Sequence, residues 1–229
     1  MAGISEKLFF GGAIAGACPD DWIDASNIRE VPDHQEIYLS RTTLSNLIVE
    51  INERVSREQV LSMLTEQSVP PLGAHANAQT EDIAAALYHL RDICDEGDMM
   101  QVINTPQPVL LQRFNPPVPA YAGLVSFTSP KRQRGGAAPN TGGAPTSIDG
   151  DTASSSAAGP QLSTYSCHFL LVRLEAQNTD LLVFVNVPHE EFDLQGDPAA
   201  LSREEELASN LLGKFVETLE VRNWGLFAC

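Results

Sequence analysis

One stretch near the middle of the chain limits what the rest can fold into. From Ser129 to Leu162 the sequence reads SPKRQRGGAAPNTGGAPTSIDGDTASSSAAGPQL, rich in Gly, Ala, Ser, Thr and Pro and almost free of side chains that a core could bury. Such a composition cannot offset the entropy of ordering a chain, so we expect a disordered insertion over residues 129–162. The rest of the chain must build its core across this interruption.

Apolar, partly β-branched segments flank the insertion on both sides. Tyr121–Phe127 precedes it, and Tyr165–Leu174 and Asp180–Val187 follow it. The short polar link Glu175–Thr179 between the last two predicts a hairpin. The insertion would then join neighbouring strands of one sheet, so we predict a single domain over residues 1–229. The alternative is a split into two domains, in which the segment after the insertion would form only a marginal core of its own.

Two helices are indicated by apolar residues at helical spacing. The first is predicted to begin with Thr80 as N-cap and to stop at Gly97. Its apolar stripe consists of Ile83, Leu87, Leu90 and Ile93. The second is predicted to begin with a capping box formed by Ser202 and Glu205, and it continues to Leu219. Both stripes are interpreted as core packing.

The N-terminal segment Lys7–Cys18, KLFFGGAIAGAC, loosely imitates a signal peptide. Its apolar run is short and is interrupted by Gly11 and Gly12, so we expect it to be retained and folded as a hairpin. Further strands are predicted at His34–Leu39 and Leu47–Ile51. Together these elements predict an α/β chain of the α+β kind, with a largely antiparallel sheet covered by a few helices.

The charge of the chain restricts its partners. Fourteen Lys and Arg face thirty Asp and Glu, which gives a formal net charge of −16. A surface this negative repels phosphate backbones and anionic lipid head groups. We therefore expect no direct binding to nucleic acid or membrane, and favour a basic protein partner.

Motifs that carry catalysis are missing from the sequence. It has no Walker A loop, no GxSxG elbow, no HExxH helix and no CxxC pair, so we predict no catalytic, cofactor or metal site. The four cysteines are expected to be free thiols. An undescribed enzyme stays open as an alternative, with a cleft lined by His89 or His168 and a thiol or carboxylate within reach.

The segment Pro19–Tyr38 combines many charged residues with regularly placed apolar ones. It is either a solvated loop anchored by its apolar residues or a charged recognition edge held rigid by Trp22 and two prolines. The residue order in and around this segment points to a known family. GGAI at 11–14, WIDAS at 22–26 and REVPDHQEIY at 29–38 resemble the Ran-binding nuclear import factors, also called Ran guanine-nucleotide release factors.

The resemblance continues through 47–53, the Tyr88-His89 pair, 180–188 and 224–228, and the insertion departs from it. It implies a PsbP-like sandwich, in which helices flank both faces of a central antiparallel sheet. It also implies binding to the GTPase Ran, with release of its guanine nucleotide in support of nuclear import, in nucleus and cytoplasm. A further Ran-binding protein could join the complex.

The resemblance assigns Ran binding to an acidic surface, with Arg29 holding the carboxylates by an ion pair. The acidic residues are Asp24, Glu30, Asp33, Glu36, Glu50 and Glu53. The competing interpretation is an acidic scaffold or chaperone-like module for another basic protein, without nucleotide release. The run Lys131–Arg134 is either a short nuclear-localisation signal or a solubilising part of the insertion.

Overall fold

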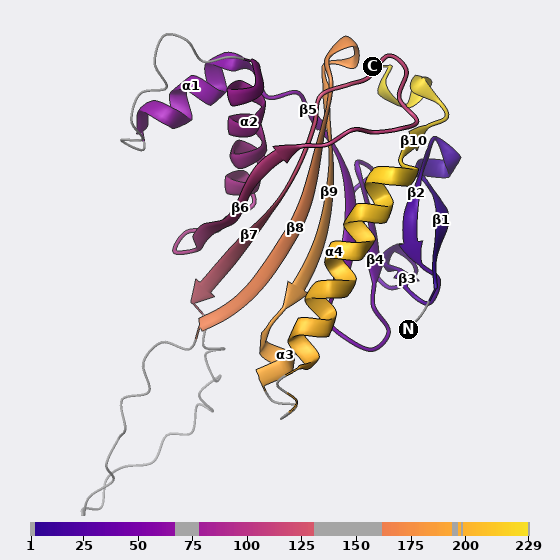
Figure 1. The fold of residues 1–229 in the computed structure, drawn as a ribbon, viewed down its shortest axis with the longest axis vertical. Helices are drawn as coiled ribbons and strands as arrows, with labels where there is room; N and C mark the ends of the chain where they lie inside the picture. Colours follow the sequence, from indigo (N-terminus) through magenta and orange to yellow (C-terminus); the bar gives the residue numbers. More distant parts are fainter. Residues whose placement is uncertain (1–2, 67–77, 131–161, 194–196, 198, 229) are drawn as a thin grey trace, which may run out of the picture.

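The large antiparallel sheet dominates the computed structural model, which describes residues 3–66, 78–130, 162–193, 197 and 199–228 (Figure 1). In spatial order its seven strands are β3 (Ile23–Asp24), β4 (Gln35–Leu39), β5 (Asn46–Glu53), β9 (Thr179–Pro188), β8 (Leu162–Leu174), β7 (Ala120–Pro130) and β6 (Met99–Pro108). Every neighbouring pair runs antiparallel. The predicted antiparallel sheet is therefore confirmed.

A second, small sheet contains the N-terminal hairpin. Strand β1 (Ile4–Phe9) pairs with β2 (Ile14–Pro19), and β2 pairs with β10 (Glu220–Val221). The 3-10 turn η1 (Phe10–Gly12) joins β1 to β2, and all three of its residues have positive φ, a conformation that glycine adopts without steric cost. The hairpin predicted from the two glycines is confirmed.

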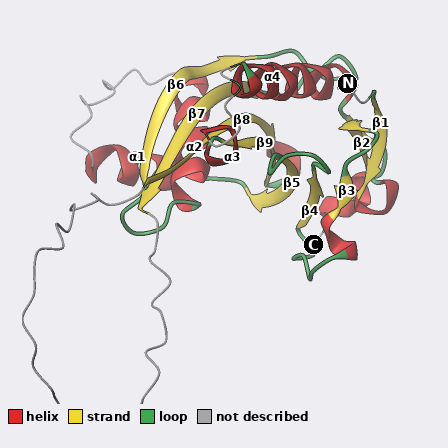
Figure 2. Cartoon of the chain, turned by 90° about the horizontal axis from the view of Figure 1, so that it is seen from below, coloured by secondary structure: helices red, strands yellow, loops and turns green. Residues whose placement is uncertain are grey.

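Helices cover both faces of the large sheet because its central strands are apolar on both sides. Helix α4 (Ala200–Thr218) packs on one face, against alternate residues such as Leu170 and Val172 of β8. Helices α1 (Arg57–Glu66) and α2 (Ala78–Asp92) lie on the other side (Figure 2). This arrangement confirms the α+β class with helices on both faces.

The remaining helical segments are short: α3 (Glu190–Asp193), η2 (Ala25–Asn27), η3 (Glu175–Gln177) and η4 (Trp224–Phe227). Within the described ranges, no helix is long and apolar enough to cross a membrane.

Both predicted helix starts are wrong by about two residues. Helix α4 begins at Ala200, and Ser202 lies inside it, so the expected capping box does not form. Instead, the Asp197 carboxylate accepts the Ala199 N–H at 2.9 Å and pairs with Arg203 at 2.6 Å. A carboxylate near the free N–H groups of a helix start serves the same purpose as an N-cap.

Helix α2 begins at Ala78, so Thr80 lies inside it, and it ends at Asp92, ahead of Gly97. Its predicted apolar stripe is only partly buried, with Leu90 inside and Ile93 45% exposed. Apart from Leu90, its buried residues are small or polar: Asp82, Ala84, Ala85, Ala86 and His89. The polar members bind charged residues of the sheet, a contact that the helix sequence alone does not indicate.

Strands β7 and β8 join the two halves of the chain. They pair continuously from Ala120↔Val172 to Pro130↔Leu162, so the strands on either side of the predicted insertion are neighbours, as expected. The expected disorder over 129–162 falls almost entirely outside the described residues, and so does the Lys131–Arg134 run.

Candidate partner-binding surface

The candidate acidic residues lie around β3, β4 and β5, and we call this group the acidic corner. Asp24 ends β3, Glu36 lies in β4, and Glu50 and Glu53 lie in β5. Glu30 and Asp33, with Arg29, come from the link between η2 and β4. Because β3, β4 and β5 are consecutive strands at one edge of the sheet, the fold brings all seven residues to that edge.

The sheet register separates Glu36 from Glu50. Gln35 faces Glu50 across β4 and β5, whereas Glu36 faces Val49. Since successive side chains of a strand point to opposite faces, Glu50 lies on the side of α2 and Glu36 on the side of α4. The acidic corner therefore wraps around the sheet edge and does not form one flat surface.

Glu36 binds the N-terminal hairpin. Its half-buried carboxylate accepts hydrogen bonds from the Phe10 backbone N–H and, at 3.2 Å, from the Tyr38 hydroxyl. Burial raises the pKa of this carboxyl despite these two bonds. Lys7 lies over the Tyr38 ring, 4.3 Å from its centroid. Glu36 thus connects the GGAI turn to β4, and its place on the partner-binding surface stays a prediction.

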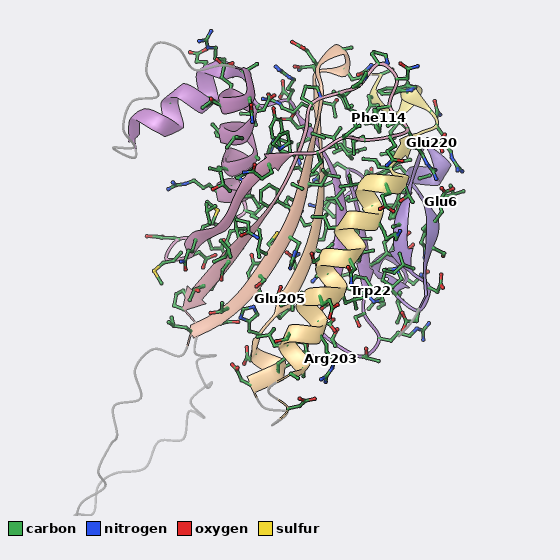
Figure 3. All side chains as sticks on the ribbon, viewed as in Figure 1. Glu6, Trp22, Phe114, Arg203, Glu205 and Glu220 are labelled. Atoms are coloured by element: carbon green, nitrogen blue, oxygen red, sulfur yellow. The ribbon has the colours of Figure 1, made fainter. Side chains whose placement is uncertain are left out.

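Asp24 and Trp22 shape the segment that carries Glu30 and Asp33. The Asp24 carboxylate accepts the Ser26 N–H at 2.9 Å and so caps η2. Trp22 is 6% exposed and packs beneath α4 (Figure 3). Trp22 therefore anchors the segment as expected, whereas Ile28, another apolar residue of the segment, is 63% exposed and does not.

The exposed members of the acidic corner are Glu30, Asp33 and Glu53. Glu50 is half-buried, and amide groups fix its carboxylate: Gln35 Nε2 donates at 3.0 Å and Asn52 Nδ2 at 2.9 Å. No ion pair joins Arg29 to these carboxylates within the described part of the chain, so the structure does not contain the expected bridge. The corner offers uncompensated negative charge.

A buried ionic cluster that the sequence analysis missed holds the end of β5. Asp180, 0% exposed, accepts hydrogen bonds from Arg173 Nε at 3.1 Å and from the Val55 N–H at 2.9 Å, and contacts His89 Nε2 at 2.9 Å. Arg173 also donates to Asp82 at 2.8 Å and to the Val55 carbonyl at 2.6 Å. Both backbone groups of Val55 are thereby fixed two residues after Glu53. The sequence did contain a sign of this cluster, because Arg173 and Asp180 are charged residues within the two apolar segments 165–174 and 180–187.

His168 comes nearest to the alternative of an undescribed enzyme. It lines a cavity of about 540 Å³, and its Nε2 lies 2.7 Å from Glu205 of α4. Ser166, His189 and Glu205 also meet nearby, but the serine and the carboxylate both contact the same nitrogen, His189 Nε2. A serine–histidine–acid relay needs the two opposite ring nitrogens, so this arrangement cannot activate the serine.

The described thiols are poor nucleophiles. Burial raises the pKa of all three, Cys18, Cys94 and Cys167, which keeps them protonated, whereas a reactive cysteine is a thiolate. Across the described residues, no group of three or more His, Cys, Asp or Glu is placed to hold a metal ion.

Glu205 of α4, labelled in Figure 3, is expected to make the stability of the fold depend on pH in the acid range. Burial opposes its ionisation, but hydrogen bonds with His168, His189 and Ser166 outweigh it and lower the pKa of Glu205 to about 2. A carboxyl with a depressed pKa stabilises the fold fully above its unfolded pKa of 4.5, and this contribution is lost as the pH falls toward 2.

Between pH 5 and pH 2, the free energy of unfolding should fall further for the wild type than for Glu205→Gln. The difference between the two falls should be at most about 3 kcal/mol. Urea unfolding at several pH values measures the difference. Glu206→Gln, an exposed neighbour on α4, should follow the wild type. Parallel pH curves for Glu205→Gln and the wild type would contradict the assignment.

Comparison with known proteins gives consistent matches. The family model described as "Mog1: Ran-interacting Mog1 protein" matches residues 7–188. The Ran guanine nucleotide release factor of Bos taurus is 35% identical over 111 residues, which are 48% of this chain and 47% of that protein. The Homo sapiens protein of the same name is 32% identical over 106 residues, 46% of this chain and 45% of that protein. The chain thus spans about half the length of the curated relatives it matches.

Two solved structures share the fold. The Saccharomyces cerevisiae Ran-binding protein Mog1p aligns with a TM-score of 0.52 and 21% identity, covering 99% of this chain and 100% of that one. A mutant of Mog1 aligns with a TM-score of 0.52 and 20% identity, covering 98% of this chain and 99% of that one. At these identities the likeness shows the fold alone.

Proposed function

Because the chain belongs to the Ran-interacting Mog1 family, we propose that it binds the small GTPase Ran and promotes release of the bound guanine nucleotide. The observation that carries the proposal is the family match over residues 7–188, a span that contains the whole acidic corner. Residues 1–229 would act as one Ran-binding domain that regulates Ran without a covalent step. The protein would support nuclear protein import, in the nucleus and the cytoplasm.

The charge of the acidic corner supports this role. Glu30, Asp33 and Glu53 are exposed, and the Glu50 carboxylate is already oriented by Gln35 and Asn52. Exposed, uncompensated charge steers a partner of opposite charge during association. A carboxylate that is already oriented loses less conformational entropy on binding.

Carboxylates could loosen the nucleotide without any chemical reaction. In GTPases of this class, a P-loop lysine and a Mg²⁺ ion hold the phosphates. A carboxylate docked beside that site would compete for the lysine or disturb the metal. Asp33 and Glu50 suit this role better than Glu36, whose carboxylate is bound to the backbone of the N-terminal hairpin.

The test is release of a fluorescent guanine nucleotide from purified Ran, with and without a molar excess of this protein. We expect faster release with the wild type. Asp33→Lys and Glu50→Lys should each weaken the acceleration by about tenfold or more, because a lysine there repels the basic partner. Glu206→Lys makes the same charge change on the exposed face of α4 and should behave like the wild type.

If both variants accelerated nucleotide release as much as the wild type does, the assignment of Asp33 and Glu50 to the binding site would be wrong. The proposed function itself would still stand. No acceleration, together with no complex detected by calorimetry, would mean that the family likeness extends to the fold alone. The acidic scaffold for another basic protein would then be the better account.

A further inference from the structure

The C-terminal turn η4 presents an aromatic ring to the solvent. Trp224 is 44% exposed, whereas Trp22, the other tryptophan of the chain, is 6% exposed. Phe114 meets the Trp224 ring edge-on, with 6.2 Å between the ring centroids, and Phe227 lies 6.0 Å away at a tilt. Both phenylalanines are buried. One part of the indole is therefore packed against the core, which holds the ring in place, while the rest of it faces water.

Ion pairs tie together the two segments that carry these rings. Arg113, next to Phe114, binds Glu6 at 2.6 Å and Glu220 at 3.4 Å. Arg222, the residue after β10, binds the same two carboxylates at 2.6 Å and 3.0 Å. Figure 3 shows Phe114, Glu220 and Glu6 in one region of the molecule. The two positive and two negative charges cancel, so this network adds no net charge beside the indole.

Main-chain hydrogen bonds place this region beside the acidic corner. The carbonyl of Ala13, the residue after η1, accepts the N–H groups of Arg222 at 2.8 Å and of Asn223 at 3.1 Å. At the other end of η1, the Phe10 N–H donates to the carboxylate of Glu36. The turn η1 is thus the shared neighbour of the acidic corner and of the segment that leads into η4.

The acidic corner alone is too small for a protein–protein interface. Its exposed carboxylates belong to Glu30, Asp33 and Glu53. A specific interface covers about 800 Å² of each partner and involves roughly 20–30 residues on each side. A protein bound at the corner must therefore also cover neighbouring surface. Tryptophan is among the residues most enriched at the positions that dominate binding energy, which singles out the exposed indole of Trp224.

We propose that Trp224 contacts the same Ran molecule as the acidic corner, with a lysine or arginine side chain of Ran lying on the exposed face of the indole. Tryptophan is the best aromatic partner for a cation, and a protein attracted by carboxylates presents basic side chains. Because the ring is held in place before binding, the contact costs little conformational entropy. The inference rests on the proposed function, since it takes Ran as the partner.

Fluorine NMR of the protein labelled with 5-fluorotryptophan observes the ring itself. The chain has two tryptophans, so two signals are expected, and the signal of Trp224 is the one missing from Trp224→Phe. In the free protein, this signal should differ between H₂O and D₂O because the ring is exposed. Addition of unlabelled Ran should move the signal and remove the solvent difference, while the signal of the buried Trp22 stays in place.

Calorimetry with purified Ran measures what the ring contributes. Trp224→Leu should weaken binding by about tenfold or more, and Trp224→Phe by less, because phenylalanine keeps an aromatic face for the cation. An unchanged Trp22 signal in both variants shows that the fold is intact. Leu44→Ala is the control and should bind like the wild type. It removes an exposed apolar side chain from the connection between β4 and β5, at the opposite end of these strands from Glu50.

The possible results separate this inference from the proposed function. If Ran bound without changing the Trp224 signal, or bound Trp224→Leu as tightly as the wild type, the contact would be overturned and the proposed function would stand. Equal weakening by Trp224→Leu and Trp224→Phe would overturn the cation on the ring face. If the wild type formed no complex with Ran, both proposals would be wrong.

Discussion

Asp180→Ala is expected to destabilise the fold by about 3–5 kcal/mol, the usual cost of removing one partner from a buried ion pair. Asp180 is 0% exposed, and its carboxylate accepts hydrogen bonds from Arg173 and the Val55 N–H. The substitution leaves the Arg173 guanidinium, which is 3% exposed as a residue, with Asp82 as its remaining carboxylate. Urea unfolding followed by tryptophan fluorescence measures the loss, since Trp22 is buried in the core.

Glu217→Ala is the matched control for this prediction. It also removes the acid of an ion pair, that with Lys214, but both side chains there are more than half exposed. Exposed pairs contribute about 0–1 kcal/mol, so this variant should stay close to the wild type. If Asp180→Ala cost no more than Glu217→Ala, the cluster around Arg173 would not hold the fold together.

Gly16→Ala is expected to destabilise the protein by about 1–3 kcal/mol through overpacking. Gly16 lies in β2, where every residue is buried. A Cβ at this position would come within 2.5–2.9 Å of three ring atoms of Phe215, which is itself 0% exposed. The aromatic ring cannot yield because it packs between α4 and the small sheet, 5.7 Å from the Phe9 ring. Chemical denaturation of the purified variant measures the loss.

Gly213→Ala makes the same substitution where there is room. Gly213 lies inside α4, and an added Cβ there has nothing within 4 Å. Helix propensity should make this variant more stable than the wild type, by up to about 1 kcal/mol.

In a double-mutant cycle, Phe215→Leu should recover part of the Gly16→Ala loss, because the shorter side chain leaves space for the methyl group. Strictly additive losses would contradict the steric account.

The central strands could be predicted from the sequence because burial on both faces produces continuous apolar runs, as in 165–174 and 180–187. Strand β6 has no such signal. It forms the edge of the sheet, most of its residues are exposed, and it contains Pro106 and Pro108, which are tolerated at edges. Helix α1 was also missed. The buried face of α2 was misplaced because Asp82 and His89 are buried by partners far away in the sequence.

The acidic corner was predicted as a set of residues, and the structure gathers them at one sheet edge. What the sequence could not provide was the direction of each side chain. Glu36 and Glu50 lie on opposite faces because of a strand register that depends on pairing between β4 and β5. The contact of Glu36 with Phe10 joins segments far apart in the sequence, so nothing in the sequence indicated that this carboxylate also binds the N-terminal hairpin.

The pairing of β7 and β8 bears on how the family can vary. The two strands stay paired as far as Pro130 and Leu162, so the chain leaves the sheet and returns to it at adjacent points, about 5 Å apart. The entropic free-energy cost of closing a loop between such points rises by only about 0.6 kcal/mol for each doubling of the loop length. Residues gained, lost or exchanged between these strands during evolution would leave the register of the sheet untouched. This place in the fold can accept new sequence, even a foreign domain, at little thermodynamic cost.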